Sequence, residues 1–209
     1  MNIKIVVFTF CCCWMSIGFA QEQTMSASDI ANFQSAMRKS VELKTLTADF
    51  TQYKKVSYVK NELVSSGKFY VKNPDRLAWI YRNPVSSALI FKDKKITIEE
   101  KGVKKTMDIS RSKQFEKISQ AIQSNMNGEI YQGTEFLLSY FHTNKQYILK
   151  LDPLAKDVKK AMKQLVLYFD KSSYQVSEVK VLDNSNGFTR FVFSNHKVNE
   201  AIADVVFEL

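Results

Sequence analysis

The chain has 209 residues, of which 45% are hydrophobic and 12% aromatic, with 30 basic and 21 acidic side chains and a net charge of +9. A chain of this length can bury enough apolar surface to fold unaided, and its three cysteines, all at residues 11–13, exclude a disulfide-rich scaffold. The basic excess would suit nucleic acid or an anionic surface, but the lysines are scattered through turns, which is typical of a solvated exterior.

Residues 1–20 have the features of a signal peptide. An apolar run over residues 5–15 follows a single lysine, and Gly18-Phe19-Ala20 places small residues where signal peptidase cleaves. The apolar run is too short to span a bilayer. We therefore predict cleavage before Gln21 and an exported single domain over residues 21–209, without disulfides and without nucleic acid as a partner.

The first predicted element of the mature chain is an amphipathic helix. Ser26 can cap its start, and Asp29 can satisfy free N–H groups of the first turn and oppose the helix dipole. The helix is expected to end near Leu43, because apolar residues recur until then in steps of three or four, at Ile30, Phe33, Met37 and Val41.

The period then changes to two, which predicts strands joined by short turns. A second helical stripe, with Phe115, Ile118 and Ile122, interrupts them over residues 113–126, and a short third helix is expected near 154–162. The predicted strands, about ten to eleven in number, cover residues 46–59, 63–71, 76–81, 88–91, 96–100, 105–109, 137–142, 146–151, 164–169, 175–182 and 189–198. A further short strand is expected at the end of the chain, over 205–209.

The strand over residues 76–81 is apolar on both faces. Leu77, Trp79 and Tyr81 share one face, and Ala78 and Ile80 share the other. A strand of this kind is covered twice, or is covered once and faces a hydrophobic space. Short turns make neighbouring strands antiparallel, and a long twisted sheet curls. We predict a mainly β (α+β) fold whose helices lie over the concave face as a plug or lid.

The sequence offers little catalytic chemistry. His142 and His196 are far apart in the chain and lie outside any known motif, and each is expected to be an ordinary histidine at a strand end. Glu99 and Glu100 point to opposite faces of a strand and cannot act as a pair. We therefore expect no enzyme activity, no metal and no cofactor.

Three stretches resemble the periplasmic outer-membrane lipoprotein carriers of the LolA type. They are residues 46–52 (LTADFTQ), 67–71 (GKFYV) and 74–84 (PDRLAWIYRNP), and the order of strands and helices extends the match over nearly all of the mature chain. The resemblance implies a periplasmic protein with an unclosed antiparallel barrel, or half-barrel, whose helices cover a hydrophobic cavity for lipoprotein acyl chains. It also implies an inner-membrane ABC-type releasing complex as donor and an outer-membrane acceptor. We expect a monomer.

Two features point to variation within this family. Asn73 stands before Pro74, where the best-known carriers have a basic residue. Residues 53–55 (YKK) and 204–207 (DVVF) are similar to those of carrier-like proteins found with aryl polyene or flexirubin-type pigment synthesis, which implies another acyl or aryl lipid as cargo. A lipid-sensing envelope interaction module is a further alternative.

Two groups of residues are predicted to contact cargo. We expect lid contacts from Phe33, Met37, Phe115, Ile118 and Ile122. Sheet curvature decides which face of each strand is concave. The predicted cavity lining is Phe50, Phe69, Leu77, Trp79, Tyr81, Leu89, Phe91, Leu165, Leu167, Phe191 and Phe193.

Overall fold

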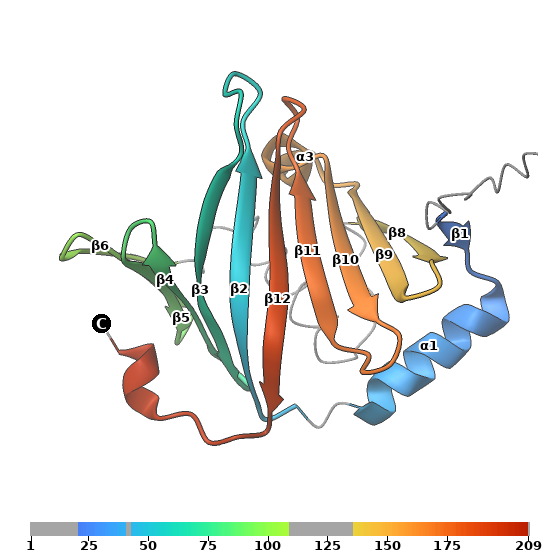
Figure 1. The fold of residues 1–209 in the computed structure, drawn as a ribbon, viewed down its shortest axis with the longest axis horizontal. Helices are drawn as coiled ribbons and strands as arrows, with labels where there is room; N and C mark the ends of the chain where they lie inside the picture. Colours follow the sequence, from blue (N-terminus) through green and yellow to red (C-terminus); the bar gives the residue numbers. More distant parts are fainter. Residues whose placement is uncertain (1–20, 41–42, 109–135, 209) are drawn as a thin grey trace, which may run out of the picture.

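The computed structural model describes residues 21–40, 43–108 and 136–208. In this part of the chain one twelve-stranded antiparallel sheet runs in the order β1-β8-β9-β10-β11-β12-β2-β3-β4-β5-β6-β7 (Figure 1). The strands are β1 (Gln23–Thr24), β2 (Thr45–Lys55), β3 (Leu63–Lys72), β4 (Arg76–Asn83), β5 (Ser87–Lys92), β6 (Lys95–Glu100), β7 (Val103–Asp108), β8 (Phe136–His142), β9 (Gln146–Pro153), β10 (Gln164–Asp170), β11 (Val176–Leu182) and β12 (Phe188–Val198).

The sheet is an unclosed half-barrel, because its two end strands, β1 and β7, do not pair with each other. Most neighbours in the sheet are hairpin partners that follow one another in the chain. The pairing of β12 with β2 is different, since it joins two arrays of consecutive hairpins, β2 to β7 and β8 to β12. These two strands have 11 residues each, the longest in the described sheet, and they form its centre (Figure 1).

The structure confirms the predicted fold class and shifts several boundaries. The strand expected over residues 46–59 ends at Lys55, and the two-residue strand β1 was not predicted. The third helix is present as α3 (Lys156–Ala161). The predicted final strand over 205–209 is wrong, because a 3-10 helix, η2 (Asp204–Phe207), occupies this region. The helix predicted over 113–126 lies outside the described residues.

Helix α1 (Ala27–Ser40) begins as its sequence predicts. Ser26 donates its hydroxyl to the Asp29 carboxylate over 2.6 Å, and the Asp29 backbone N–H donates to the Ser26 hydroxyl over 3.2 Å. The apolar stripe then meets the sheet through Phe33, whose ring centroid lies 4.7 Å from Tyr147 and 5.4 Å from Phe169. Helix α1 therefore packs over β9 and β10.

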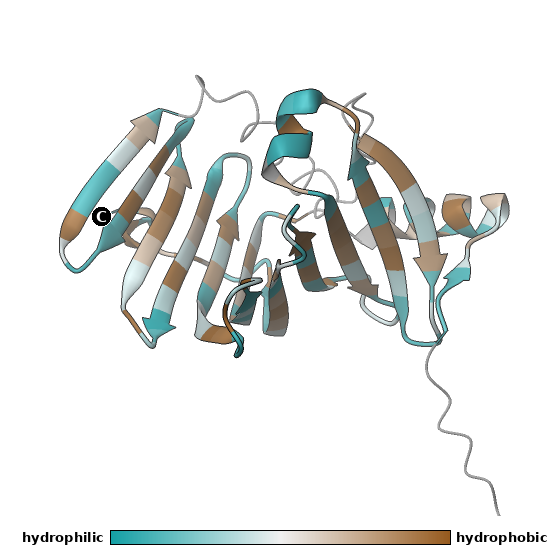
Figure 2. Cartoon of the chain, turned by 90° about the horizontal axis from the view of Figure 1, so that it is seen from above, coloured by the Kyte–Doolittle hydropathy of each residue, from teal (hydrophilic) through white to brown (hydrophobic). Residues whose placement is uncertain are grey.

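Helices α1 and α3 cover the same face of the sheet. Met37 on α1, and Val158 and Met162 on and beside α3, belong to one buried cluster with Phe50 and Phe69. We call the face that carries this cluster the inner face and the opposite one the outer face. Figure 2 shows α3 between the two arms of the sheet, with hydrophobic residues along the strands on both sides.

The outer face of β4 and β5 is covered by the C-terminal segment. Phe207, only 2% exposed, packs with the buried side chains of Ala78 and Ile90. Asp204 forms ion pairs with Lys72 and with Arg76, the latter over 2.7 Å, and the hydrogen bond from Lys72 is the main cause of the lowered pKa of its carboxyl group. This segment therefore covers the apolar residues on the outer face of β4.

We predict that Phe207→Ala destabilises the protein by about 3 kcal/mol, since it removes a fully buried aromatic ring. Val205 lies in the same turn but is 68% exposed, so Val205→Ala is the matched control and should change stability by less than about 0.5 kcal/mol. Urea unfolding of the two variants measures the difference. Equal midpoints for both would contradict the burial of Phe207 on the sheet.

Candidate functional site

The strand register places all the residues predicted to line a cavity on the inner face. Residues directly opposite each other in an antiparallel pair share a face. Phe69 is opposite Trp79, and Trp79 is opposite Leu89. The other members are connected to these by further pairs or by alternation along a strand, among them Leu77 with Phe91, Phe50 with Phe193, Phe191 with Val179, Leu167 with Val179 and Leu165 with Val181.

Burial divides these residues into two groups. Leu165 and Leu167 have no exposed surface and belong to the core that includes α1 and α3. Phe50, Phe69, Leu77 and Phe193 are also buried. The remaining members are only half-buried and lie on β4, β5 and β12, namely Trp79, Tyr81, Leu89, Phe91 and Phe191. An apolar ligand on the inner face would meet this second group first.

The predicted lid residues are placed only in part. Phe33 and Met37 are 5% and 4% exposed and pack into the core on the inner face. Phe33 contacts β9 and β10 rather than the half-buried residues of β4 and β5. Phe115, Ile118 and Ile122 lie outside the described residues.

Six rings from β2, β3, β4 and β12 form a continuous surface, which we call the aromatic patch. Trp79 lies 4.5 Å from Phe69 and 6.0 Å from Phe191, measured between ring centroids. Phe69 lies 5.4 Å from Phe193. The patch consists of Phe50, Phe69, Trp79, Tyr81, Phe191 and Phe193. Offset and tilted rings at these distances attract one another beyond their burial of area.

Polar atoms interrupt the aromatic patch at two places. The Tyr81 hydroxyl donates a hydrogen bond to the side-chain oxygen of Gln52 over 2.7 Å. Burial raises the pKa of Tyr81 to about 12, so its phenol stays protonated at neutral pH and remains a donor. The indole N–H of Trp79 is buried and has no hydrogen-bond partner among the residues that the structure describes. Sequence reasoning did not select Gln52, although it ends the Phe-Thr-Gln motif.

Gly67 allows the contact between β2 and β4. It lies between Phe50 and Tyr81 in the sheet, next to a register shift in the pairing of β3 with β4. A Cβ atom at this position would lie 2.0 Å from the backbone oxygen of Ile80. Because Gly67 has no side chain, Tyr81 approaches Phe50 edge to face at 5.0 Å across β3 and reaches Gln52.

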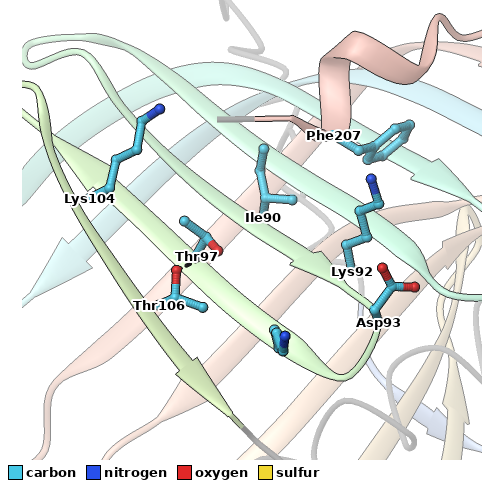
Figure 3. A pocket seen from close by; sticks show the side chains of 8 residues that line it. Ile90, Lys92, Asp93, Thr97, Lys104, Thr106 and Phe207 are labelled. Carbon is cyan, nitrogen blue, oxygen red and sulfur yellow. Dashed lines mark hydrogen bonds between the residues drawn. The ribbon is translucent and has the colours of Figure 1, made fainter.

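A separate pocket of about 300 Å³ lies on the outer face beside η2 (Figure 3). Ile90 and Phe207 supply its apolar part, and Thr97 and Thr106 hydrogen-bond to each other over 3.1 Å. The other lining residues are all charged, namely Lys92, Asp93, Lys95 and Lys104. Charged walls hold water strongly, so this pocket is a poor site for an acyl chain.

The two histidines take part in local contacts. His196 Nε2 lies 3.0 Å from the carbonyl oxygen of Val176, and His142 Nδ1 lies 3.3 Å from Lys171 Nζ. Within residues 21–40, 43–108 and 136–208, no three His, Cys, Asp or Glu side chains are placed to hold a metal ion. In the same ranges, no helix is long and apolar enough to cross a membrane.

These features define an unclosed half-barrel whose helix-bearing face keeps a half-covered aromatic surface, the arrangement of a protein that binds an apolar ligand. The chain belongs to the LolA family, described as outer membrane lipoprotein carrier protein LolA, whose model matches residues 41–209. None of the curated protein sequences compared with it matches.

Several solved structures are similar to this chain at low sequence identity. The crystal structure of MucB has a TM-score of 0.50 at 10% identity, over 88% of this chain and 64% of MucB. A LolA superfamily protein from Nitrosomonas europaea has a TM-score of 0.46 at 10% identity, over 88% of this chain and 98% of its own. The lipoprotein LppX from Mycobacterium tuberculosis has a TM-score of 0.43 at 14% identity, over 85% of this chain and 99% of its own.

We predict that Gly67→Ala lowers the free energy of unfolding by about 1–3 kcal/mol, because the added methyl group collides with the backbone of β4. Gly102→Asn is the control, since Gly102 has a φ of +78° that asparagine tolerates and nothing lies within 4 Å of a Cβ there. That control should change stability by less than about 0.5 kcal/mol. Guanidinium unfolding followed by tryptophan fluorescence tests both, and an unchanged Gly67→Ala midpoint would contradict the close approach.

Proposed function

We propose that this protein is a periplasmic carrier that shields lipoprotein acyl chains on its inner face and ferries them from the inner to the outer membrane. One observation supports this most directly: the aromatic patch is continuous across four strands, yet Trp79, Tyr81 and Phe191 stay half-buried. Membership of the LolA family supports the same proposal, because the family is named for lipoprotein carriers. An inner-membrane ABC-type complex would be the donor and an outer-membrane acceptor the recipient of the cargo.

The energetics of acyl chains explain why a carrier is needed. Each CH₂ group withdrawn from water contributes about 0.8 kcal/mol, so one sixteen-carbon chain represents on the order of 12 kcal/mol. A site that recovered all of this would hold its cargo at about nanomolar affinity or tighter and release it slowly. Partial burial of the patch in the free protein lowers the net gain, because cargo then replaces contacts that already exist.

A second candidate cargo is an aryl lipid. The aromatic patch brings six rings together on one face, with neighbouring centroids 4.5 to 6.5 Å apart. Such a surface suits a planar conjugated group, since offset and edge-on ring contacts add to the burial of area. This observation favours a carrier of an aryl or other acyl lipid within the same fold.

Native mass spectrometry with lipid extraction tests the proposal on protein exported by its own organism. A bound lipoprotein would support general lipoprotein sorting. A free acyl or aryl lipid would support the specialised carrier instead. Protein that is repeatedly empty, and that takes up no fluorescent fatty-acyl probe, would overturn both and leave an interaction module as the alternative.

We predict that Leu89→Asn weakens binding of a fluorescent fatty-acyl probe by about 5- to 10-fold, because a half-buried inner-face leucine loses its contact with the chain. Ile80→Asn is the matched control, since Ile80 is also half-buried but packs with the outer cluster beside Phe207. Ile80→Asn should destabilise the protein without weakening its binding of the probe. Equal losses of affinity in both variants would show that loading follows stability alone.

A further inference from the structure

Two hydrogen-bond donors lie within the aromatic patch and lack acceptors among the described residues. The first is the indole N–H of Trp79, which is buried and unpartnered. The second is the side-chain amide of Gln52, whose oxygen already accepts from Tyr81 and whose NH₂ group makes no hydrogen bond with the described residues. A buried donor without a partner costs free energy, so the unpartnered indole N–H of Trp79 beside a binding surface suggests that a ligand supplies its acceptor. The amide of Gln52 is only half-buried and is available to the same ligand.

The two donors flank one residue. Trp79 precedes Tyr81 by two positions on β4, so both point to the inner face about 7 Å apart along the strand. Gln52 reaches Tyr81 from β2 across the unsubstituted Gly67. Both donors border Phe191, because the Trp79 ring lies 6.0 Å from the Phe191 ring and Gln52 is directly opposite Phe191 in the sheet.

The chemistry of this area is neutral and donor-rich. An indole N–H can only donate, and the Gln52 oxygen is already engaged. The ion pair of Asp49 with Lys68, at 2.7 Å, lies on the outer face, because both residues alternate with the inner-face Phe50 and Phe69. A neutral acceptor suits such a site better than a charged group, since a charge would lose its hydration without a counter-charge.

We propose that Trp79 and Gln52 form a polar subsite that binds the carbonyl oxygen of an ester or amide linkage in an acyl lipid. This inference rests on the proposed function, because it assumes that acyl chains occupy the inner face. The aromatic patch then holds the beginning of the chain, and the subsite fixes how deeply the linkage enters. The protein distinguishes acyl lipids from hydrocarbons or ethers of the same length.

The test compares two lipids that differ only in the linkage. Dioleoylglycerol has ester carbonyls, and the chain-matched dioleyl ether of glycerol has none. Each is titrated against delipidated full-length exported protein that carries a fluorescent fatty-acyl probe. We expect the diester to displace the probe at about 5-fold lower concentration than the diether, which corresponds to one or two net hydrogen bonds.

Variants identify the donors. Trp79→Phe removes the indole N–H, and the double variant Gln52→Leu with Tyr81→Phe removes the amide without leaving the phenol unpaired. Each should reduce the preference for the diester, measured as the ratio of the two displacing concentrations, to less than about 2-fold. A loss of affinity that is common to both lipids cancels in this ratio. Tyr53→Phe is the matched control and should keep the preference, because Tyr53 lies on the outer face of β2 with its ring against Arg190. Thermal unfolding of each variant confirms that it is folded.

The outcomes are separable. Equal affinity of the wild-type protein for the two lipids, or a preference that survives both variants, would overturn the subsite and leave the carrier proposal standing. If neither lipid displaces the probe and the probe itself does not bind, the proposed function fails and the subsite fails with it.

Discussion

The pairing of β12 with β2 is the contact on which the rest of the structure depends. It joins the array β2 to β7 to the array β8 to β12, which are otherwise paired only within themselves or with β1. At the centre of the sheet it brings together residues that are more than a hundred positions apart in the sequence. Phe193 opposite Phe50 sets the register, and a shift by one residue would turn either strand's aromatic side chains to the outer face. The aromatic patch exists only in this register, because Phe50 comes from one array and Phe191 and Phe193 from the other.

The two halves of the sheet have different tasks. Helices α1 and α3 pack on the inner face with β9 and β10, where Leu151, Leu165 and Leu167 have no exposed surface. On β4 the outer face is covered by Phe207 and its neighbours, while the inner face keeps its aromatic rings half-buried. The two-sided apolar strand thus has two separate explanations: one face is structural and the other remains available to a ligand.

Alternation along each strand was enough to predict which residues share a face, because a period of two needs only local sequence. Which face of each strand lies with those of its neighbours had to come from the strand pairing, which places the residues from Phe50 to Phe193 on one face. The division of that set could not be predicted, since it depends on where α1 and α3 pack. The pairing of Gln52 with Tyr81 also needs the backbone of Gly67 and a register shift, which local patterns do not contain. Residues 205–207 have β-forming side chains, but the outer face of β4 and β5 binds Phe207 as part of a 3-10 turn. Tertiary packing here overrides strand propensity.

Separating the core from the half-buried rings reconciles stability with ligand exchange. If the aromatic patch were the main core, each exchange of cargo would uncover the contacts that hold the fold together. Instead, Leu151, Leu165 and Leu167 on β9 and β10 have no exposed surface and pack with the helices. The patch joins this core through its buried members Phe50, Phe69 and Phe193. Rings such as Trp79 and Phe191 can then exchange protein contacts for lipid contacts at little cost to the sheet, because the β12–β2 pairing is carried by backbone hydrogen bonds and by the buried pair Phe50 and Phe193.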